Sequence, residues 1–484
     1  MRIGYILNAL SLILRYLSLI ILIPIGIAIY YHDWYSIVPF VVASLVAFLS
    51  GIVIRNKKVT FDYFNDLKRT EGLAIVTLFW VIFAFIVMIV YLFYGFSPIN
   101  ALFEATSGIT TTGATILTDF SAYPKTMFFF RSFTQWLGGM GIIIMFIAVL
   151  PQFAVAGRQM FFAEATGPVK DKITPRIKNT AITLWCVYII LTALQILCLR
   201  WAGMGLFEAA CHSFSTISAG GFSPNAASIS EYGTKISWIM IVFMFLAGTN
   251  FALQYKAFFK GQLAKLFTNE EFRFYCGVII VISSLLASAL IINQHFDIAT
   301  SVRESLFQVI SMLTSSGFAT LDFANWNTAE KVFLFTTAMI GACAGSAAGG
   351  VKAVRVLFAF KFLKREIAKL VHPQGVFTMK LDNKVVPNEI ADQILSFLVF
   401  YIVICVITSI MATVIESNLI VGMSGAIASL GNIGPGFADI GPMNNFNDLH
   451  IATKLIFIFN MIVGRLELVP FLIFLHPDLW KFRK

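Results

Sequence analysis

Long apolar stretches alternate along this chain with shorter, more polar segments. Two apolar stretches open it, at about Ile6–Tyr30 and Ile37–Ile54. A helix rises about 1.5 Å per residue, so about 20 apolar residues cross a hydrocarbon layer of ~30 Å. We therefore expect two membrane-spanning helices here. The first is expected to be retained rather than cleaved as a signal peptide, because it is long and contains Arg15.

After this pair, a three-part unit recurs four times: a long apolar helix, a shorter stretch ending in Gly beside small or hydroxylated residues, and a second apolar helix. The short stretches are Asn100–Gly113, Leu206–Gly221, Ser301–Gly317 and Val421–Gly434. They are too short to span a bilayer, so we expect them to enter and leave on the same side. The pattern predicts an all-α polytopic membrane protein with ten spanning helices and four half-crossings.

The predicted organisation has five parts. An N-terminal helical pair with a basic loop occupies residues 1–70. Four pore repeats then cover 71–178, 179–273, 274–388 and 389–484, and the third carries a glycine-rich interruption.

Composition and charge distribution support this organisation. Of the 484 residues, 58% are hydrophobic and 12% are charged, whereas soluble domains carry roughly 25% charged residues, so a soluble enzyme is excluded. The net charge is +10, and most Lys and Arg residues lie in five short segments: Arg55–Arg69, Arg158–Lys178, Lys256–Arg273, Lys352–Lys384 and Lys481–Lys484. The positive-inside rule places these segments and both termini in the cytoplasm. The basic charge then indicates a lipid bilayer as the partner rather than nucleic acid, and it gives all four units the same orientation.

The four short stretches end in similar sequences: Thr110–Ala114, Ser218–Phe222, Thr314–Phe318 and Gly431–Pro435. Glycine adopts positive φ without steric cost, which lets consecutive carbonyls turn the same way. Four such strands around an axis would form rings of carbonyl oxygens that replace the hydration shell of a potassium-sized cation. The C-terminal ends of the short helices would add partial negative charge, and no ring of Lys or Arg accompanies them.

Four segments carry a resemblance to a known family: RSFTQWLGGMGI (131–142), STISAGGFS (215–223), GACAGSAAGG (341–350) and GRLELVP (464–470). With the four units, they resemble the Trk/Ktr/HKT superfamily of potassium transporters over essentially the whole chain. This resemblance implies two N-terminal helices plus four parallel M1-pore helix-M2 repeats around a pseudo-fourfold central pore.

The resemblance also implies which residues form a potassium-binding filter. The filter glycines would be Gly113, Gly221, Gly317 and Gly434, and the carbonyls beneath them would come from Thr111, Thr112, Ala219, Gly220, Ser315, Ser316, Asn432 and Ile433. The adjacent pair Gly220-Gly221 leaves the register of the second unit open by one residue. Matching Gly221-Phe222 to Gly317-Phe318 favours Gly221.

The run from Gly341 to Gly350 has two interpretations. Gly341, Gly345 and Gly349 recur every four residues, as in a helix-packing face. Alternatively, ten residues without a large side chain cannot hold a rigid helix. The resemblance implies the second interpretation: an intramembrane gate loop, with Gly350 and Lys352 at its end.

Arg465 lies within an apolar stretch, where a charge is costly and suggests function. The resemblance implies that it lies beneath the filter as an electrostatic barrier. A structural pair with Glu467 or with carbonyls of a neighbouring helix is the alternative.

Smaller features carry weaker expectations. Glu104 and Glu208 each follow Leu-Phe and are expected to cap helix N-termini, with an outer cation-attracting role as the alternative. His212 is expected to be a packed or hydrogen-bonded residue rather than a ligand. Asp119, Asp322 and Asp439 would either concentrate cations outside or be solvated loop charges. The six cysteines show neither disulfide nor metal-site spacing.

The resemblance finally implies K⁺ as the transported and bound ion, no covalently bound cofactor, and the bacterial cell inner membrane as the location. It also implies a homodimer and a cytoplasmic nucleotide-binding regulatory ring of the TrkA type. The predicted function is channel-like K⁺ uptake, with a symporter coupled to protons or sodium as the alternative. Buried acidic residues would favour symport, and apart from Glu467 they are expected to be nearly absent from the spanning segments. An intramembrane enzyme is not expected, because no paired nucleophile and base is found.

Overall fold

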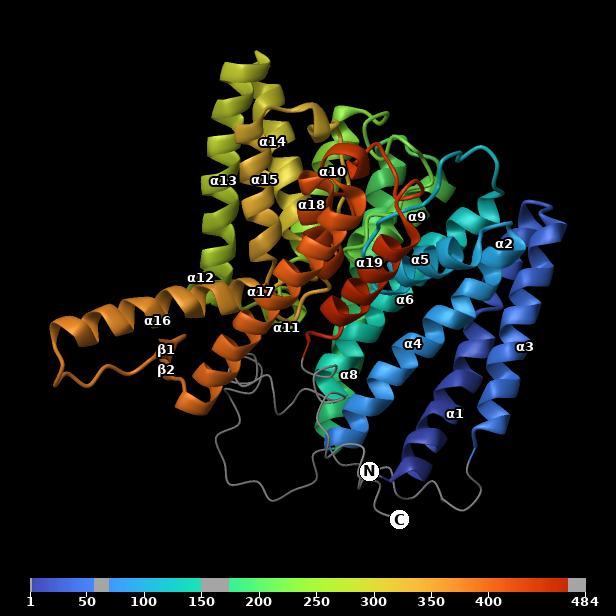
Figure 1. Ribbon diagram of the computed structural model, residues 1–484, viewed down its shortest axis with the longest axis horizontal. Coiled ribbons are helices and arrows are strands. Elements are labelled where there is room, and N and C mark those ends of the chain that lie inside the picture. Colours follow the sequence, from blue (N-terminus) through green and yellow to red (C-terminus); the bar gives the residue numbers. More distant parts are fainter. Residues whose placement is uncertain (1, 56–68, 149–173, 469–484) are drawn as a thin grey trace.

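The computed structural model describes residues 2–55, 69–148 and 174–468, and it consists of helices with one short β-hairpin (Figure 1). The N-terminal pair is formed by α1 (Ile3–Ile20), α2 (Ile23–Tyr30), a 3₁₀ turn (Trp34–Ser36) and α3 (Ile37–Val53). The first predicted helix is therefore two helices, α1 and α2. Pro24 lies in the first turn of α2, where its missing N–H is tolerated, so the chain restarts a helix there.

The remaining elements form four groups in chain order. The first is α4 (Arg69–Phe93), α5 (Pro98–Ile109) and α6 (Lys125–Ala148). The second is α8 (Thr174–Trp201), α9 (Leu206–Ile217), α10 (Thr234–Ala247), α11 (Phe251–Gln254), a π-helix (Tyr255–Phe259) and α12 (Ala264–Thr268). The third is α13 (Glu270–Gln294), α14 (Ile298–Leu313), a 3₁₀ turn (Phe323–Asn325), α15 (Thr328–Ile340), α16 (Ala353–Val371), β1 (Lys380–Leu381) and β2 (Lys384–Val385). The fourth is α17 (Asn388–Glu416), α18 (Leu419–Leu430), a 3₁₀ turn (Ala438–Ile440) and α19 (Ile451–Arg465).

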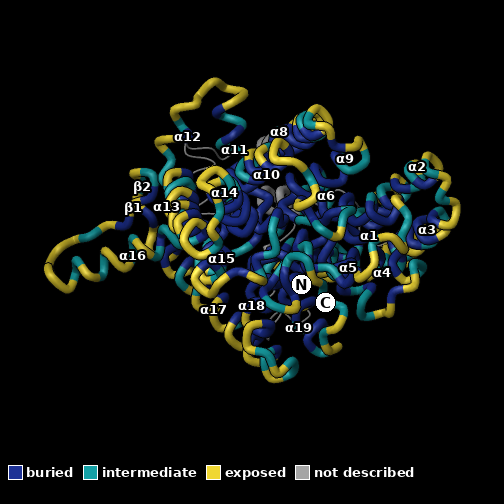
Figure 2. The backbone as a smooth tube through the Cα atoms, turned by 90° about the horizontal axis from the view of Figure 1, so that it is seen from above, coloured by how far each residue is buried: buried dark blue, intermediate teal, exposed yellow. Residues whose placement is uncertain are grey.

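The four groups close into a ring. In each group the short helix (α5, α9, α14 or α18) packs against the second long helix of the preceding group: α6 contacts α9, α10 contacts α14, α15 contacts α18, and α19 contacts α5. Seen from above, the short helices lie around the middle of the molecule (Figure 2). This cyclic pattern of contacts places the ends of the four short helices around one central axis.

Each short helix begins and ends at defined signals. Side chains cap three of the N-termini: Ser97 accepts a hydrogen bond from the Asn100 N–H, Asp297 from that of Thr300, and Asn418 from those of Ile420 and Val421. Each helix ends four residues before the glycine predicted for the filter. Twelve to sixteen residues reach at most about 24 Å, so these helices are too short to cross the hydrocarbon layer.

The second helix of the second group is not continuous, so the predicted helix at Ile236–Tyr255 is wrong. Helix α10 ends at Ala247, and the segment Phe251–Phe259 leaves it at an angle of 102°. The Asn250 side chain accepts hydrogen bonds from two backbone N–H groups and starts the new helix. The carbonyls of Ala247 and Gly248 bond to a loop of the third group instead of continuing α10.

The second helices of the other groups also differ from one another. The predicted helix Val332–Phe360 is split into α15 and α16 by a non-helical segment, residues 341–352. Helix α19 ends at Arg465, and residues 469–475 of its predicted stretch lie outside the described residues. Among the described residues, six helical stretches are long and apolar enough to span a membrane if α1 and α2 count as one, or seven if the bent pair of the second group also counts as one span. Among the ten predicted spans, the second helices of the second and third groups are therefore interrupted by non-helical residues.

Helix α16 extends sideways from the bundle in both views (Figures 1 and 2). It is followed by the antiparallel hairpin of β1 and β2, which pairs Lys380 with Val385 and turns at Asp382-Asn383, both with positive φ.

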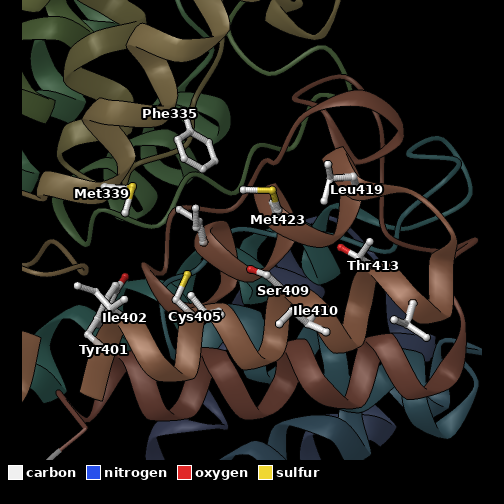
Figure 3. A pocket seen from close by; sticks show the side chains of 13 residues that line it. Phe335, Met339, Tyr401, Ile402, Cys405, Ser409, Ile410, Thr413, Leu419 and Met423 are labelled. Carbon is white, nitrogen blue, oxygen red and sulfur yellow. The ribbon is translucent and has the colours of Figure 1, made fainter. Parts of the chain in front are cut away.

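The third and fourth groups enclose an apolar cavity of about 380 Å³ (Figure 3). Its walls come from α15, α17 and α18, and include Phe335, Met339, Tyr401, Cys405 and Met423. None of the predicted filter residues lines it. Ile402 and Ile410 on its rim are more than half exposed, so the cavity faces the outer surface of the bundle, where the bilayer would lie.

Candidate functional site

The four strands that follow the short helices share one backbone conformation. Two residues before the filter glycine, a non-glycine residue adopts positive φ in every repeat: Thr111 (53°), Ala219 (58°), Ser315 (53°) and Asn432 (52°). The glycines Gly113 (87°), Gly221 (77°), Gly317 (68°) and Gly434 (104°) do the same. Gly220 is not among the positive-φ residues, so Gly221 is the structural equivalent of Gly113. This agreement resolves the register of the second repeat.

The same glycines lie against one another's strands in a closed ring. A Cβ atom added to Gly113 would lie 2.1 Å from the carbonyl oxygen of Gly220, and one on Gly221 would lie 1.9 Å from that of Ser316. One on Gly317 would lie 2.1 Å from the Ile433 oxygen, and one on Gly434 would lie 2.7 Å from the Thr112 oxygen. Each glycine thus adjoins the carbonyl that precedes the glycine of the next repeat. Only a residue without a side chain fits at any of the four positions.

Side chains from behind hold these strands. Gln135 on α6 donates from Nε2 to the Gly220 carbonyl at 2.6 Å and accepts from the Phe222 N–H at 3.0 Å. Asn432 donates to Thr112 Oγ1 and to the Met461 carbonyl, both at 2.9 Å. Sequence reasoning assigned no role to Gln135. An amide within a predicted span was the available signal, because such groups face the protein interior.

The segment between α15 and α16 contacts the strands of the predicted filter, beneath which it was expected to lie. Gly341, Gly345, Gly350 and Lys352 all adopt positive φ, so the run is a loop and the helix-packing interpretation is wrong. The Gly349 N–H donates to Ser315 Oγ at 2.6 Å, and a Cβ on Gly349 would lie 2.4 Å from the Gly431 carbonyl. Lys352 donates from Nζ to the carbonyl of Ala348. We call residues 341–352 the loop beneath the filter.

This loop is attached to the broken helix of the second repeat. The Cys343 N–H donates to the Gly248 carbonyl at 3.0 Å, and the Phe251 N–H donates to the Gly345 carbonyl at 3.1 Å. The buried carboxylate of Glu271 accepts from the Ala344 N–H at 2.6 Å. The break in α10 therefore supplies backbone groups that hold the loop in place.

Arg465 is 2% exposed and joins two other repeats. Its guanidinium donates to the Ala347 carbonyl of the loop at 3.0 Å and to the Gly138 carbonyl of α6 at 3.1 Å. A Cβ on Gly138 would lie 1.9 Å from the Ile109 carbonyl, so that part of α6 lies against the end of α5. Glu467 instead pairs with Arg355 at 2.5 Å. Arg465 therefore contacts carbonyls of neighbouring elements, which was one of the two structural alternatives, and it lies beside the loop.

Buried acidic residues lie in two of the short helices and in the first turns of longer ones, outside the predicted spanning segments, so the expected scarcity within those segments is not contradicted. Five carboxylates in the helices are less than 5% exposed: Glu71, Glu104, Glu271, Glu304 and Glu330. Glu71 pairs with Arg2, Glu104 with Arg131 and Glu304 with Arg303. Glu330 accepts from Asn293. Sequence reasoning assigned no role to Glu71, Glu271 or Glu330, whose partners are distant in sequence.

The weaker expectations about Glu104, Glu208, His212 and Asp119 had different outcomes. Glu104 does not cap a helix, because it lies in the middle of α5, whereas Glu208 is in the first turn of α9. His212 is buried and hydrogen-bonded, as expected. Asp119 is exposed and holds a local turn, where hydrogen bonds from Ser121 lower the pKa of its carboxyl. All six cysteines are free, and the described part of the chain holds no cluster of three His, Cys, Asp or Glu residues suited to a metal ion.

Comparison with known proteins agrees with this architecture. The family model TrkH, a cation transport protein, matches residues 47–481. The chain is 37% identical over 426 residues to the Trk system potassium uptake protein TrkH of Salmonella typhimurium, covering 86% of this chain and 87% of that protein. It is 33% identical to TrkG of Escherichia coli, with 96% of each covered.

The crystal structure of the potassium transporter TrkH from Vibrio parahaemolyticus superposes with a TM-score of 0.91 at 31% identity, covering 99% of this chain and 100% of that one. An intramembrane enzyme is thereby excluded, since the family consists of transporters. This chain belongs to the TrkH family of cation transport proteins and is a multi-pass membrane protein.

Proposed function

We propose that this chain takes up K⁺ through a channel-like pore whose selectivity filter is the ring of Gly113, Gly221, Gly317 and Gly434. The single observation that carries the proposal is the closed ring, in which each glycine adjoins a carbonyl of the next repeat. Rings of backbone carbonyls replace the hydration shell of K⁺. The relatives' names, which refer to potassium uptake, support the choice of ion.

The filter residues would act through their backbone. Thr111, Ala219, Ser315 and Asn432 adopt the left-handed conformation two residues before each glycine, and this alternation turns successive carbonyls to one side. The short helices end at these strands, and each contributes about half a negative charge there. A cation that has lost its water is therefore stabilised, and an anion is not.

The loop beneath the filter would be the gate, with Arg465 as an electrostatic barrier. Its contacts with Ser315 and with the Gly431 backbone support a position that blocks the path below the filter. Gly341, Gly345, Gly349 and Gly350 would let the loop change shape. Helix α16 follows the loop directly and carries Arg355, Lys361 and Lys364, so a cytoplasmic partner that moves α16 would move the loop.

The direct test is ion flux in liposomes for the wild type and for Gly113→Ser. The wild type should pass K⁺ and Rb⁺ far better than Na⁺, and the variant should lose that preference. Equal permeability of all three ions in both proteins would defeat the filter assignment.

Coupled symport with protons or sodium is the second candidate, and the buried carboxylate of Glu271 beside the loop favours it. The two mechanisms separate in a flux assay with K⁺ at electrochemical balance and an imposed pH or Na⁺ gradient. Net K⁺ movement driven by either gradient indicates symport, and none is expected from a channel.

We further propose a homodimer in the bacterial inner membrane, with both termini cytoplasmic and a nucleotide-binding regulatory ring of the TrkA type bound to the cytoplasmic face. Family membership supports these assignments. The C-terminal residues 469–484 and most of two basic loops lie outside the described residues. The mass of the detergent-solubilised protein, measured with and without a purified ring, tests both assemblies.

A further inference from the structure

The residue nine positions before each filter glycine occupies the same place on each short helix. These residues are Glu104, His212, Gln308 and Gly425. In the first three repeats this side chain bonds the strand that continues outward from the filter. In the fourth, a Cβ on Gly425 would lie 2.5 Å from the ring of Phe457, so no side chain fits there. The four repeats thus support their filter strands by different chemistry.

In the first repeat the support is charged. Glu104 is fully buried and accepts a hydrogen bond from the Ile116 N–H at 3.0 Å and from Thr115 Oγ1 at 3.2 Å. Thr115 and Ile116 follow Gly113 by two and three residues. The Glu104 carboxylate therefore holds the outer strand of this filter segment through its backbone.

Arg131 on α6 extends this support to the second repeat. It is 1% exposed, and its Nε donates to Glu104 at 2.8 Å. One terminal nitrogen donates to Thr115 Oγ1 at 3.0 Å, and the other donates to the Ser223 carbonyl at 3.2 Å. Its guanidinium also lies 4.0 Å from the centre of the Phe222 ring. Phe222 and Ser223 directly follow Gly221, so one guanidinium bridges two filter strands.

The second repeat completes the connection with a neutral group. His212 Nδ1 lies 2.8 Å from the Glu208 carbonyl, which can only accept, so Nδ1 carries the proton. Nε2 lies 3.1 Å from the Ser223 hydroxyl, within hydrogen-bond distance. In the third repeat Gln308 donates to Thr320 Oγ1 at 3.2 Å. Among the described residues at this position of the short helices, the Glu104–Arg131 ion pair of the first repeat contacts two filter strands.

We propose that Glu104 and Arg131, joined through Thr115, are positioning residues that set the spacing of the filter strands of repeats 1 and 2 and hence the preference for K⁺ over Na⁺. This inference rests on the proposed filter. A buried ion pair is weak evidence for stability, because desolvation offsets its attraction. A fork that bonds two strands at once instead fixes their separation. Lysine carries the same charge but lacks that fork.

The test compares Arg131→Lys and Thr115→Val with the wild type in liposomes, at matched protein content, by K⁺ and Na⁺ flux. Arg131→Lys keeps the charge beside Glu104, and Thr115→Val keeps both charges and the side-chain shape, so at least one variant should fold. We expect the K⁺ to Na⁺ flux ratio to fall about tenfold in Arg131→Lys and about threefold in Thr115→Val, while K⁺ flux continues.

The matched control is Arg2→Lys. Arg2 lies outside the four repeats and donates from Nε and a terminal nitrogen to the buried carboxylate of Glu71, so the flux ratio should stay at the wild-type value. If Arg131→Lys or Thr115→Val folds and keeps the wild-type K⁺ to Na⁺ flux ratio, the inference is overturned, even where thermal stability is lower. Those residues would then have a structural role only. The variant Gly113→Ser distinguishes failure of the positioning role from failure of the proposed filter. If it loses selectivity and the positioning variants do not, the positioning role fails and the filter stands; if it too keeps selectivity, the filter assignment fails.

Discussion

The ring of glycines makes a graded prediction about alanine substitution. Gly221 has φ of +77°, and an L-residue in the left-handed region costs about 1–2 kcal/mol. An added Cβ would lie 1.9 Å from the Ser316 carbonyl oxygen, and real Cβ contacts are essentially never closer than 3.0 Å. The two strands must therefore separate by 1.1 Å, the difference between these distances. A displacement of this size moves a proposed filter carbonyl out of register.

Gly221→Ala should therefore lower the K⁺ to Na⁺ flux ratio by at least about tenfold, which corresponds to ~1.4 kcal/mol of lost discrimination. Gly434→Ala should have a smaller effect, because its Cβ would lie 2.7 Å from the Thr112 carbonyl and the required shift is 0.3 Å. Gly113→Ala and Gly317→Ala, at 2.1 Å each, should resemble Gly221→Ala.

The assay is K⁺ and Na⁺ flux into liposomes at equal protein content, with Gly233→Ala as the control. Gly233 precedes α10 with ordinary φ, and no atom lies within 4 Å of its added Cβ. Its substitution should leave the ratio unchanged. The reasoning is refuted if Gly221→Ala retains wild-type selectivity, or if Gly434→Ala is more damaging than Gly221→Ala.

Three further predictions concern the gate and the packing around the filter. Arg465→Ala should raise K⁺ flux, because it removes a positive charge and the bonds to Ala347 and Gly138; unchanged flux and gating in reconstituted vesicles would contradict the barrier role. Ser315→Ala should raise basal flux about fivefold by removing one hydrogen bond of ~1 kcal/mol to the loop; a fall in basal flux would argue against a closed loop. Gly464→Ala should destabilise the protein by about 1–3 kcal/mol, since its Cβ would lie 2.0 Å from the Leu430 carbonyl, and thermal unfolding in detergent would measure this.

Much of the candidate site was predictable because its signals are local. The short apolar helices, their capping residues and the glycine that follows each one lie within about 20 residues of one another. The small-residue run at 341–350 left a helix-packing face and a loop open, and the family resemblance favoured the loop. Even the register at Gly221 followed from its match to Gly317.

The errors share a different origin. The break after α10 was missed because it depends on a loop nearly 100 residues later that bonds the carbonyls of Ala247 and Gly248. Glu104 was taken for a cap because its partner Arg131 lies on the next helix. In both cases, the decisive partner came from another element, and hydropathy contains no information about that pairing.

The sequence by itself determined that this is a polytopic membrane protein and predicted four like-oriented repeats, since hydrophobic length, positive charge and glycine placement act over short distances. The tertiary structure decided that the repeats close into a ring, each glycine against a carbonyl of the next, and that one buried ion pair bridges two of their strands. Those features depend on contacts between distant segments, where backbone spacing and the desolvation of charged groups decide which partners meet.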